Sequence, residues 1–404
     1  MHILLIHQAF AALDEPGGTR HHEIAQYLVK RGHCVTIIAS PVSYLTGKSG
    51  DQIAAEEQQA GIRILRAYTY SALHRSFVHR IFSFLSFMVS SFITGYKVKN
   101  VDLVWGTSPP IFQSLTAWAL ARIKGTPFLL EIRDLWPAFA IAVGVLRQPQ
   151  LIAASEWLEK FLYQHADQVV VNSPGFIDHV RDHGAKNVVL IPNGADTRMF
   201  DPHAPGDIGH HSIDIPGKFI ALYAGAHGLS NDLGVLLQAA AILKNRSEIF
   251  FVLLGDGKDK PALQKQAQDL ALPNLKFLPP LPKNEMPAAL AAADACIAIL
   301  KPIPIYGTVY PNKVFDYMAA GKPVLLAMQG VIREVVEAAG AGLVIPPGDP
   351  PALAEGITYL AEHQDEGFTM GTRGRSYVKK YFDRPDQAEK FARLIDDLVD
   401  FDKV

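Results

Sequence analysis

One short stretch of this sequence combines a charged group with the start of a helix, an arrangement that can hold a phosphate. Pro311 fixes its own φ and Asn312 is a residue type that caps helices, so we expect a helix to begin here, capped by Asn312. Lys313 then lies in the first turn, where the helix dipole disfavours a cation by a few tenths to about 1 kcal/mol. That cost is explained if Lys313 and the free N–H groups of the helix start hold an anion together. The alternative is a solvated lysine on an ordinary helix.

A second pair of charged residues follows a buried strand. The apolar run 128–132 is typical of a strand and continues directly into Arg133 and Asp134. Doubly wound sheets contact their ligands at the carboxyl ends of their strands. Adjacent residues in an extended segment point to opposite sides, so we expect at least one of the two to reach a ligand. The alternative is a mutually neutralised pair at a strand end.

Glycine-rich turns follow three other predicted strands, and such turns let the backbone approach a ligand closely. They are Gly17-Gly18, the turn Gly225-Ala-His-Gly228 that contains His227, and Gly255-Asp-Gly257. The first turn lacks the G-x-G-x-x-G spacing, so a nicotinamide cofactor has little support. A flexible loop is the alternative for Gly17-Gly18.

Strands and helices alternate along the whole chain, which favours parallel sheets of the α/β class. The expected strands are 2–6, 34–39, 62–67, 103–105, 128–132, 168–172 and 188–191, and then 219–223, 250–254, 275–278, 295–299, 324–326 and 342–345. Pro192-Asn-Gly194 is a cluster of helix and strand breakers between these two sets. We therefore expect two Rossmann-like doubly wound domains, 1–195 and 196–384. A last helix, 385–404, follows the second set and can pack back onto the first domain.

The composition fits a two-domain enzyme of the cytosol. The chain has 404 residues, 49% of them hydrophobic, and a formal net charge of −2, so we expect no nucleic-acid partner. Cys34 and Cys296 each lie in or beside an apolar run, which indicates buried thiols and no disulfide or metal cluster. The N-terminus runs into a strand, with no sign of a signal peptide. Because no apolar run reaches about 18 residues, we expect no membrane-spanning helix.

One segment nevertheless has the composition of a membrane-surface helix. Residues 81–93 carry no charge and are rich in phenylalanine, and no acidic residue occurs from Gln58 to Val101 although several basic ones do. An apolar helix with basic flanks can rest on an anionic leaflet. We predict membrane contact through Phe82, Phe84, Phe87 and Phe92. The alternative is an apolar helix buried against a sheet.

Taken together, these motifs resemble glycosyltransferase family 4, and within it the WbuB-type enzymes of bacterial surface polysaccharide assembly. The motifs, in family order along nearly the whole chain, are Gly17-Gly18-Thr19, Arg133-Asp134-Leu-Trp-Pro137, Ile191-Pro-Asn-Gly194, Gly255-Asp-Gly257, Pro311-Asn-Lys313 with Asp316-Tyr-Met-Ala-Ala-Gly-Lys-Pro323, and Pro347-Gly-Asp349. The resemblance implies a GT-B fold, in which two Rossmann-like domains face each other across a cleft. The second domain would hold a nucleotide sugar and the first an acceptor. It also implies transfer with retention of anomeric configuration and without a metal ion or other cofactor.

The same resemblance suggests roles for individual residues. Arg133, Asp134 and Lys313 would be catalytic, and Asp316 would accept hydrogen bonds from the nucleotide ribose. The donor would be held by Gly17, Gly18, Gly225, His227, Gly255, Gly257, Asn312, Asp316 and Glu334. The chain also departs from the family pattern: Thr308 stands where many members have a first glutamate, Ala226 and Asn231 where they have an arginine and a lysine, and Arg133 where they have a histidine.

The expected function is transfer of a sugar from a nucleotide sugar, a UDP-sugar above all, to a lipid-linked or glycan acceptor in bacterial surface polysaccharide synthesis. The enzyme would work in the cytoplasm as a peripheral protein on the inner face of the cytoplasmic membrane. Two alternatives remain: a sugar-nucleotide epimerase on the same fold, and a non-catalytic sugar-binding protein. Fold alone does not fix the reaction.

Overall fold

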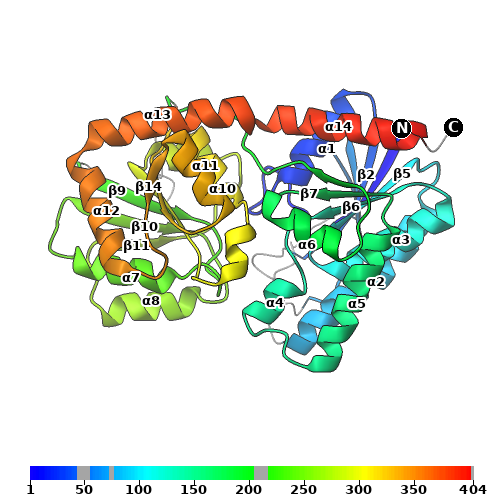
Figure 1. Ribbon diagram of the computed structural model, residues 1–404, viewed down its shortest axis with the longest axis horizontal. Coiled ribbons are helices and arrows are strands. Elements are labelled where there is room, and N and C mark those ends of the chain that lie inside the picture. The colour runs from blue at the N-terminus through cyan, green and yellow to red at the C-terminus, as the bar shows by residue number, and fades with distance from the viewer. Residues whose placement is uncertain (43–54, 72–76, 204–216, 402–404) are drawn as a thin grey trace. The chain divides into compact units, whose positions relative to one another are not determined.

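The computed structural model describes residues 1–42, 55–71, 77–203 and 217–401. They form two compact units. The N-terminal unit comprises residues 1–12, 17–192 and 385–404, and the C-terminal unit comprises residues 13–16 and 193–384. Each unit is a layered α/β structure (Figure 1).

The N-terminal unit is built on one sheet with the strand order β3-β4-β2-β1-β5-β6-β7-β8. The strands are β1 His2–Ile6, β2 Cys34–Ala39, β3 Glu56–Gln59, β4 Ile62–Arg66, β5 Leu103–Ser108, β6 Phe128–Ile132, β7 Gln168–Val171 and β8 Val188–Leu190. All neighbours pair in parallel except β3 with β4. The central strands are buried apolar runs, as parallel strands covered on both faces should be.

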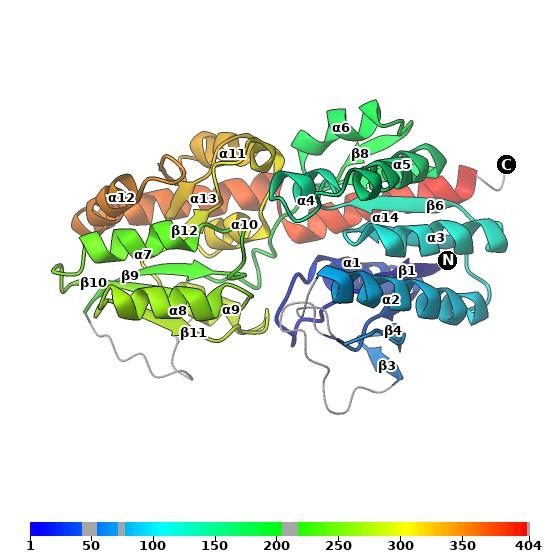
Figure 2. The ribbon, with the colours of Figure 1, turned by 90° about the horizontal axis from the view of Figure 1, so that it is seen from below.

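Helices cover both faces of this sheet. They are α1 Arg20–Lys30, α2 Phe77–Lys97, α3 Ile111–Lys124, α4 Ala138–Ala142, α5 Pro149–His165, α6 Ile177–Asp182 and α14 Arg384–Phe401, with a 3₁₀ turn at Pro174–Phe176. Side chains of α1 and α14 share one core with β1, β2 and β5. Within it Phe391 of α14 lies 4.5 Å from Trp105 of β5, measured between ring centroids. On the other face α2 and α3 lie side by side (Figure 2).

The C-terminal unit repeats the design with the order β11-β10-β9-β12-β13-β14, all parallel. Its strands are β9 Phe219–Ala224, β10 Ile249–Leu254, β11 Leu275–Leu278, β12 Ala295–Ile299, β13 Val324–Ala327 and β14 Gly342–Val344. Its helices are α7 Leu233–Ile242, α8 Lys260–Asp269, α9 Met286–Ala291, α10 Asn312–Ala319, α11 Val331–Ala339, α12 Pro350–Glu362 and α13 Gln364–Tyr381, with a 3₁₀ turn at Pro304–Thr308. The predicted class, two Rossmann-like parallel α/β sheets, is confirmed.

The two chain segments that join the units run together beside the C-terminal unit. Ala195 forms an isolated parallel bridge with Asp383, and its backbone N–H donates to Phe382 O at 3.1 Å. A Cβ on Gly194 would lie only 2.0 Å from that Phe382 carbonyl oxygen. The glycine of the predicted breaker cluster therefore lets the two crossing segments touch.

Two features differ from the expectations drawn from the sequence. The edge strand β3 was not predicted, because Glu56–Gln59 is polar and partly exposed and lacks an apolar signal. Helix α2 is longer than its uncharged part, and the 20 residues Val78–Lys97 are long and apolar enough to cross a membrane by length and composition alone. The expectation from the sequence considered only the uncharged run, which is shorter than this helix. In this unit α2 instead packs one of its faces on α3 and β2.

Candidate functional site

In the C-terminal unit, Lys313 lies in the first turn of α10, as expected, and reaches the loop that follows β9. Its Nζ donates to Tyr223 Oη at 2.8 Å and lies 3.5 Å from Asn231 Oδ1 and 4.0 Å from the centroid of the Tyr223 ring. Tyr223 Oη itself donates to Ala226 O at 2.7 Å. The partners of Lys313 among the described residues are thus a phenol and an amide, and no carboxylate forms an ion pair with it.

No acidic side chain among the described residues neutralises the charge of Lys313. Although part of the side chain is accessible, burial of the amine lowers the pKa of Lys313 from its usual 10.5 to about 7. A protonated amine held in protein without a counter-ion is a strong attractor for an anion, because the anion restores the interactions lost with water. The first turn of a helix adds a dipole of the same sign.

Glycines bring the loops after β9 and β10 together below this lysine. A Cβ on Gly225 would lie 2.7 Å from Lys313 Nζ, and one on Gly255 would lie 1.9 Å from the carbonyl oxygen of Gly225. Gly255 also has φ of +147°, which side chains rarely tolerate. A Cβ on Gly257 would lie 2.4 Å from the carbonyl oxygen of His227. In this unit Gly255 and Gly257 thus serve contact between loops, and Gly225 makes room for the lysine.

His227 is fully buried between these loops. Its backbone N–H donates to Asp256 O at 2.8 Å, but neither ring nitrogen has a hydrogen-bond partner among the described residues. Burial, followed by the charge of Lys260, lowers the pKa of His227 to about 4, so the ring is neutral at pH 7. A neutral imidazole with free nitrogens can donate to or accept from a ligand. An unsatisfied buried polar group costs about 1–3 kcal/mol, which a ligand would recover.

The remaining residues expected at the donor site differ in their surroundings. We expected Asn312 to cap α10, but it does not. Pro311 occupies the N-cap position and Asn312 is the first helical residue. Its Oδ1 is buried with no partner among the described residues. Asp316 Oδ2 accepts from Lys283 Nζ at 2.6 Å. Glu334 is exposed in the first turn of α11.

Lys260 and Lys283 were missed by reasoning from the sequence. Lys260 Nζ donates to the carbonyl oxygens of Gly255 at 2.7 Å and of Leu278 at 3.0 Å, so it ties the loop after β10 to the end of β11. Neither lysine carries a sequence signal of its own, because each contact joins residues of different elements.

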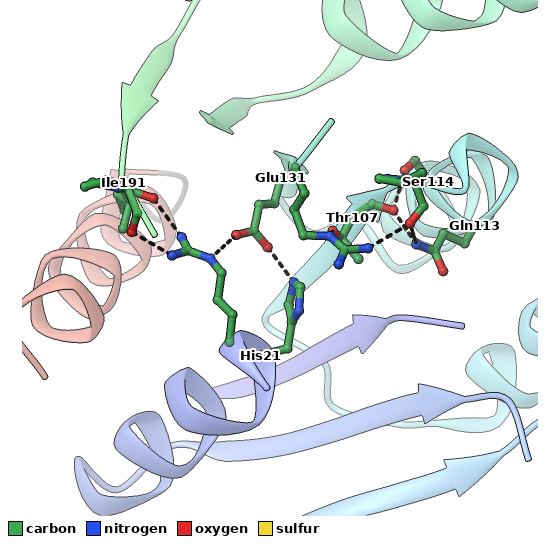
Figure 3. A network of polar contacts seen from close by, with 10 residues as sticks. His21, Thr107, Gln113, Ser114, Glu131 and Ile191 are labelled. Carbon is green, nitrogen blue, oxygen red and sulfur yellow. Dashed lines mark hydrogen bonds and ion pairs between the residues drawn. The ribbon is translucent and has the colours of Figure 1, made fainter. Parts of the chain in front are cut away.

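In the N-terminal unit, Arg133 and Asp134 follow β6 as predicted. The Arg133 guanidinium donates to Thr107 Oγ1 at 2.9 Å and to Pro109 O at 2.8 Å (Figure 3). The carboxylate of Asp134 has no hydrogen-bond partner among the described residues, and burial raises its pKa to about 6 although Arg133 acts in the opposite direction. Asp134 is therefore a carboxyl group that can exchange a proton near neutral pH.

A buried cluster of charged side chains lies beside this pair, and its centre is Glu131 of β6. Glu131 accepts from Arg20 Nε at 2.8 Å and from His21 Nε2 at 2.6 Å (Figure 3). Arg20 also donates to the carbonyl oxygens of Ile191 and Pro192, both at 2.8 Å. Burial alone would raise the pKa of Glu131, but His21 and Arg20 outweigh it and hold the pKa well below its usual range. The cluster fixes the start of α1 against the carboxyl ends of the strands.

His7 is a further residue that the sequence analysis missed. It follows β1, is fully buried, and has no hydrogen-bond partner for either ring nitrogen among the described residues. Its ring centroid lies 4.1 Å from that of His21, and burial holds its pKa well below the usual value. The rule that found Arg133, a polar residue directly after a buried strand, would have found His7 as well.

The two glycines of the pair Gly17-Gly18 have different surroundings. A Cβ on Gly17 would lie 2.8 Å from the Cβ of Ala11, whereas one on Gly18 would meet nothing within 4 Å. Gly17 therefore has a packing role, and Gly18 leaves the backbone before α1 open to an approaching molecule.

The four phenylalanines of α2 that were expected to contact a membrane are not equivalent. Phe82 is 58% exposed, and Phe84 and Phe92 are partly buried. Phe87 is fully buried, so its predicted membrane contact is wrong in this structure: it lies on the face that packs against α3 and β2. The exposed apolar stripe of the helix consists of Val78, Phe82, Val89, Ile93 and Tyr96.

Comparison with known proteins identifies the family of the chain. Residues 17–194 match a family model described as "Glycosyl transferase 4-like domain", and residues 218–363 match "Glycosyl transferases group 1". The chain is 24% identical over 391 residues to the putative colanic acid biosynthesis glycosyl transferase WcaI of Escherichia coli. This alignment covers 91% of this chain and 93% of the relative. It is 26% identical over 329 residues to the probable glycosyltransferase WbjE of Pseudomonas aeruginosa, covering 80% of each.

Solved structures share the fold of the whole chain. Sucrose-phosphate synthase from Thermosynechococcus elongatus superposes with a TM-score of 0.78 at 19% identity over 98% of each chain. HepE of Anabaena, solved in complex with UDP and glucose, gives 0.72 at 18% identity over 98% of this chain and 100% of its own. WaaG, a glycosyltransferase involved in lipopolysaccharide biosynthesis, gives 0.70 at 15% identity over 97% and 99%. The chain is therefore a glycosyltransferase with the GT-B fold and belongs to glycosyltransferase family 4.

Proposed function

We propose that this glycosyltransferase moves a sugar from a nucleotide sugar to a lipid-linked or glycan acceptor in the synthesis of a bacterial surface polysaccharide. The donor we favour is a UDP-sugar, and transfer proceeds with retention of configuration and without a metal ion. Two kinds of likeness support the proposal: the relative WcaI is named for colanic acid biosynthesis, and the structural neighbour HepE was solved with UDP and with UDP-glucose.

The observation that carries the donor assignment is the partly buried Lys313 at the start of α10, which forms no ion pair among the described residues. Cleavage of a nucleotide sugar leaves a diphosphate on which negative charge grows. A preorganised cation and helix N–H groups aimed at that charge lower the barrier by several kcal/mol. Lys313 can supply the positive charge for which other transferases use a metal, and the neutral His227 can add a hydrogen bond.

On the acceptor side, Asp134 is the group suited to proton exchange. Its pKa of about 6 leaves most of the carboxyl ionised at pH 7 yet able to take a proton from an acceptor hydroxyl. Arg133, held by Thr107 and Pro109, would fix the acceptor beside it.

We further propose that the exposed stripe of α2 rests on the inner face of the cytoplasmic membrane. Val78, Phe82, Val89, Ile93 and Tyr96 lie at spacings of 3, 4 or 7 residues and thus on one side of the helix, while Lys97 and Lys99 are exposed at its end. Such a face enters the headgroup region of an anionic leaflet. A peripheral enzyme placed there would meet a lipid-linked acceptor.

The test of the donor assignment is thermal unfolding of the protein with UDP-, GDP- and ADP-sugars in the presence of EDTA. A ligand that binds the native state alone raises the melting temperature as RT ln(1 + [L]/Kd). We expect a shift with one class of nucleotide sugar, lost in Lys313→Met and kept in Lys265→Ala, which changes an exposed lysine of α8. If no nucleotide sugar shifts the transition, the donor assignment is wrong.

Incubation of the protein with the nucleotide sugar that binds distinguishes a transferase from an epimerase. An epimerase converts the free nucleotide sugar with no acceptor present, so appearance of the epimer in solution would favour that alternative. Transfer to a membrane extract with release of the nucleotide, and no epimer in the remaining free donor, would favour the transferase.

For membrane contact, co-sedimentation with liposomes that contain anionic lipid should fall in Phe82→Asp. Phe368→Asp is a matched control, because Phe368 is 73% exposed on α13 of the other unit. Equal sedimentation of both variants and the wild type would contradict the proposed membrane face.

A further inference from the structure

The N-terminal unit contains a group of potential metal ligands that the sequence analysis did not anticipate. Glu159 lies on α5, His179 on α6, and His183 directly after α6. One ligand atom from each residue lies within 4.8 Å of the other two. Among the described residues, this is the group of histidine, cysteine and carboxylate side chains close enough to share one ion. We propose that Glu159, His179 and His183 bind a divalent transition-metal ion, with zinc as the best match.

The geometry of the three ligands is close to that of a zinc site. The His179 Nε2 atom lies 2.8 Å from Glu159 Oε1, and His183 Nε2 lies 3.9 Å from Glu159 Oε2. Ligands at about 2.0–2.1 Å from a tetrahedral zinc are roughly 3.3–3.5 Å apart. The two nitrogen–oxygen distances, each to a different oxygen of Glu159, lie on either side of that value.

Two atoms facing each other in this group lack other partners. The distance of 3.9 Å between His183 Nε2 and Glu159 Oε2 is too long for a hydrogen bond. Neither atom forms a hydrogen bond elsewhere among the described residues, although Glu159 is only 1% exposed. Both atoms keep a lone pair available for water or for a ligand. A cation between the two atoms would satisfy both.

Outer contacts hold the ligands in the orientation that a metal needs. His183 Nδ1 donates to His179 O at 2.7 Å, which assigns the proton to Nδ1 and leaves the Nε2 lone pair toward Glu159. Tyr163 Oη donates to Glu159 Oε1 at 3.0 Å and orients the carboxylate. The two imidazole rings stack with centroids 4.0 Å apart. Metal-binding histidines and carboxylates commonly have such second contacts.

The donor set indicates which ion would bind and what it would do. Two imidazoles and one carboxylate suit zinc and its neighbours in the first transition row, whereas calcium and magnesium prefer oxygen ligands alone. The side chains of His179 and His183 are 23% and 25% exposed, so water can supply a fourth ligand. The ion would join α6, a helix of six residues, to the longer α5. Its role would be structural and independent of the donor chemistry proposed above.

The experiment uses full-length protein without a histidine tag, freed of metal by a chelator that is then removed. Cobalt(II) is added, and its visible absorption reports the ligand set directly. We expect one equivalent to bind with the intense spectrum of a four- or five-coordinate nitrogen–oxygen site, and zinc to displace it. Zinc should also raise the melting temperature of the protein.

Variants locate the site and separate it from adventitious binding. Glu159→Gln keeps the size of the side chain and should weaken cobalt binding by at least about a hundredfold, while Tyr163→Phe should weaken it by about tenfold, as for a contact outside the ligands. His363→Ala, which removes an exposed histidine after α12, should bind as the wild type does. Circular dichroism of each variant verifies folding, with His183→Asn as a second ligand change. Two results would overturn the proposal: folded wild-type protein that binds no cobalt, or Glu159→Gln and His183→Asn variants that bind cobalt as tightly as the wild type does.

Discussion

Replacing Lys313 by methionine should stabilise the ligand-free protein and abolish nucleotide binding at the same time. The pKa of Lys313, lowered by burial from 10.5 to about 7, corresponds to roughly 5 kcal/mol that folding loses by burying the charged amine. Because part of the side chain is accessible, we discount this value by about half and expect a gain of roughly 2–3 kcal/mol in Lys313→Met. The lost contact costs little, since Tyr223 Oη still donates to Ala226 O.

The sign of the pH dependence is fixed by the same pKa. The folded state holds the proton less tightly than the unfolded state, so the penalty is complete below about pH 7 and disappears as the pH rises toward 10.5. The difference in unfolding free energy between Lys313→Met and the wild type should therefore be largest at and below neutral pH. Urea unfolding monitored by tryptophan fluorescence over this range measures it, with Lys265→Ala as the control for loss of an ordinary surface charge.

Ligand binding should depend on pH in the complementary way. A diphosphate beside Lys313 favours the protonated amine, so binding takes up a proton and UDP should bind more weakly as the pH rises above about 7, by up to tenfold for each pH unit. Calorimetry in buffers of different ionisation enthalpy counts the proton. Lys265→Ala, which keeps Lys313, should show the same pH dependence as the wild type. If the affinity of the wild type for UDP does not fall as the pH rises above about 7, the lysine does not contact the diphosphate.

Three further predictions test other parts of the structure. Glu131→Gln leaves Arg20 buried without its counter-ion and should lower the unfolding free energy by about 3 kcal/mol; a change below about 1 kcal/mol would mean that the cluster is not a structural tie. Gly255→Ala places a Cβ 1.9 Å from Gly225 O and should destabilise the protein by more than about 2 kcal/mol, whereas Gly18→Ala, which meets nothing within 4 Å, should leave unfolding within about 0.5 kcal/mol of wild type; equal effects would contradict the loop packing. Asp134→Asn should lower kcat by at least about a hundredfold and remove the acidic limb of the pH–rate profile near pH 6, with unchanged UDP affinity; an intact limb would exclude Asp134 as the titrating group.

The elements of the fold that rest on apolar periodicity could be predicted from the sequence. The run Phe128–Ile132 was expected as a buried strand and is β6, and the same reasoning found the other strands of both sheets except β3. Glu56–Gln59 becomes a strand only because Ile62–Arg66 offers its edge, and no local pattern encodes that pairing. Strand formation there depends on tertiary context.

The site could be predicted where a residue has a fixed relation to one element. Lys313 lies one residue inside a helix start, and Arg133 and Asp134 directly follow a strand, so their positions followed from local rules. The prediction that Asn312 caps α10 was wrong, because Pro311 occupies the N-cap and Asn312 is the first helical residue.

Contacts between elements far apart in the sequence could not be predicted. The pairing of Lys283 with Asp316 joins residues 33 positions apart, and that of Arg20 with Glu131 joins residues 111 positions apart. The burial of Phe87 has the same origin, since the composition of α2 gives no information about which face meets α3. One sequence cannot reveal such pairs without the fold.

The most direct test of the central claim is transfer of a radiolabelled sugar from nucleotide donors into the lipid fraction of bacterial membranes, in EDTA. We expect label from one donor, a UDP-sugar, to enter the organic phase with the wild type and with Lys265→Ala, and to stay in the aqueous phase with Lys313→Met. Retained transfer in Lys313→Met, or no transfer from any UDP-, GDP- or ADP-sugar by protein that binds one of them, would contradict the account.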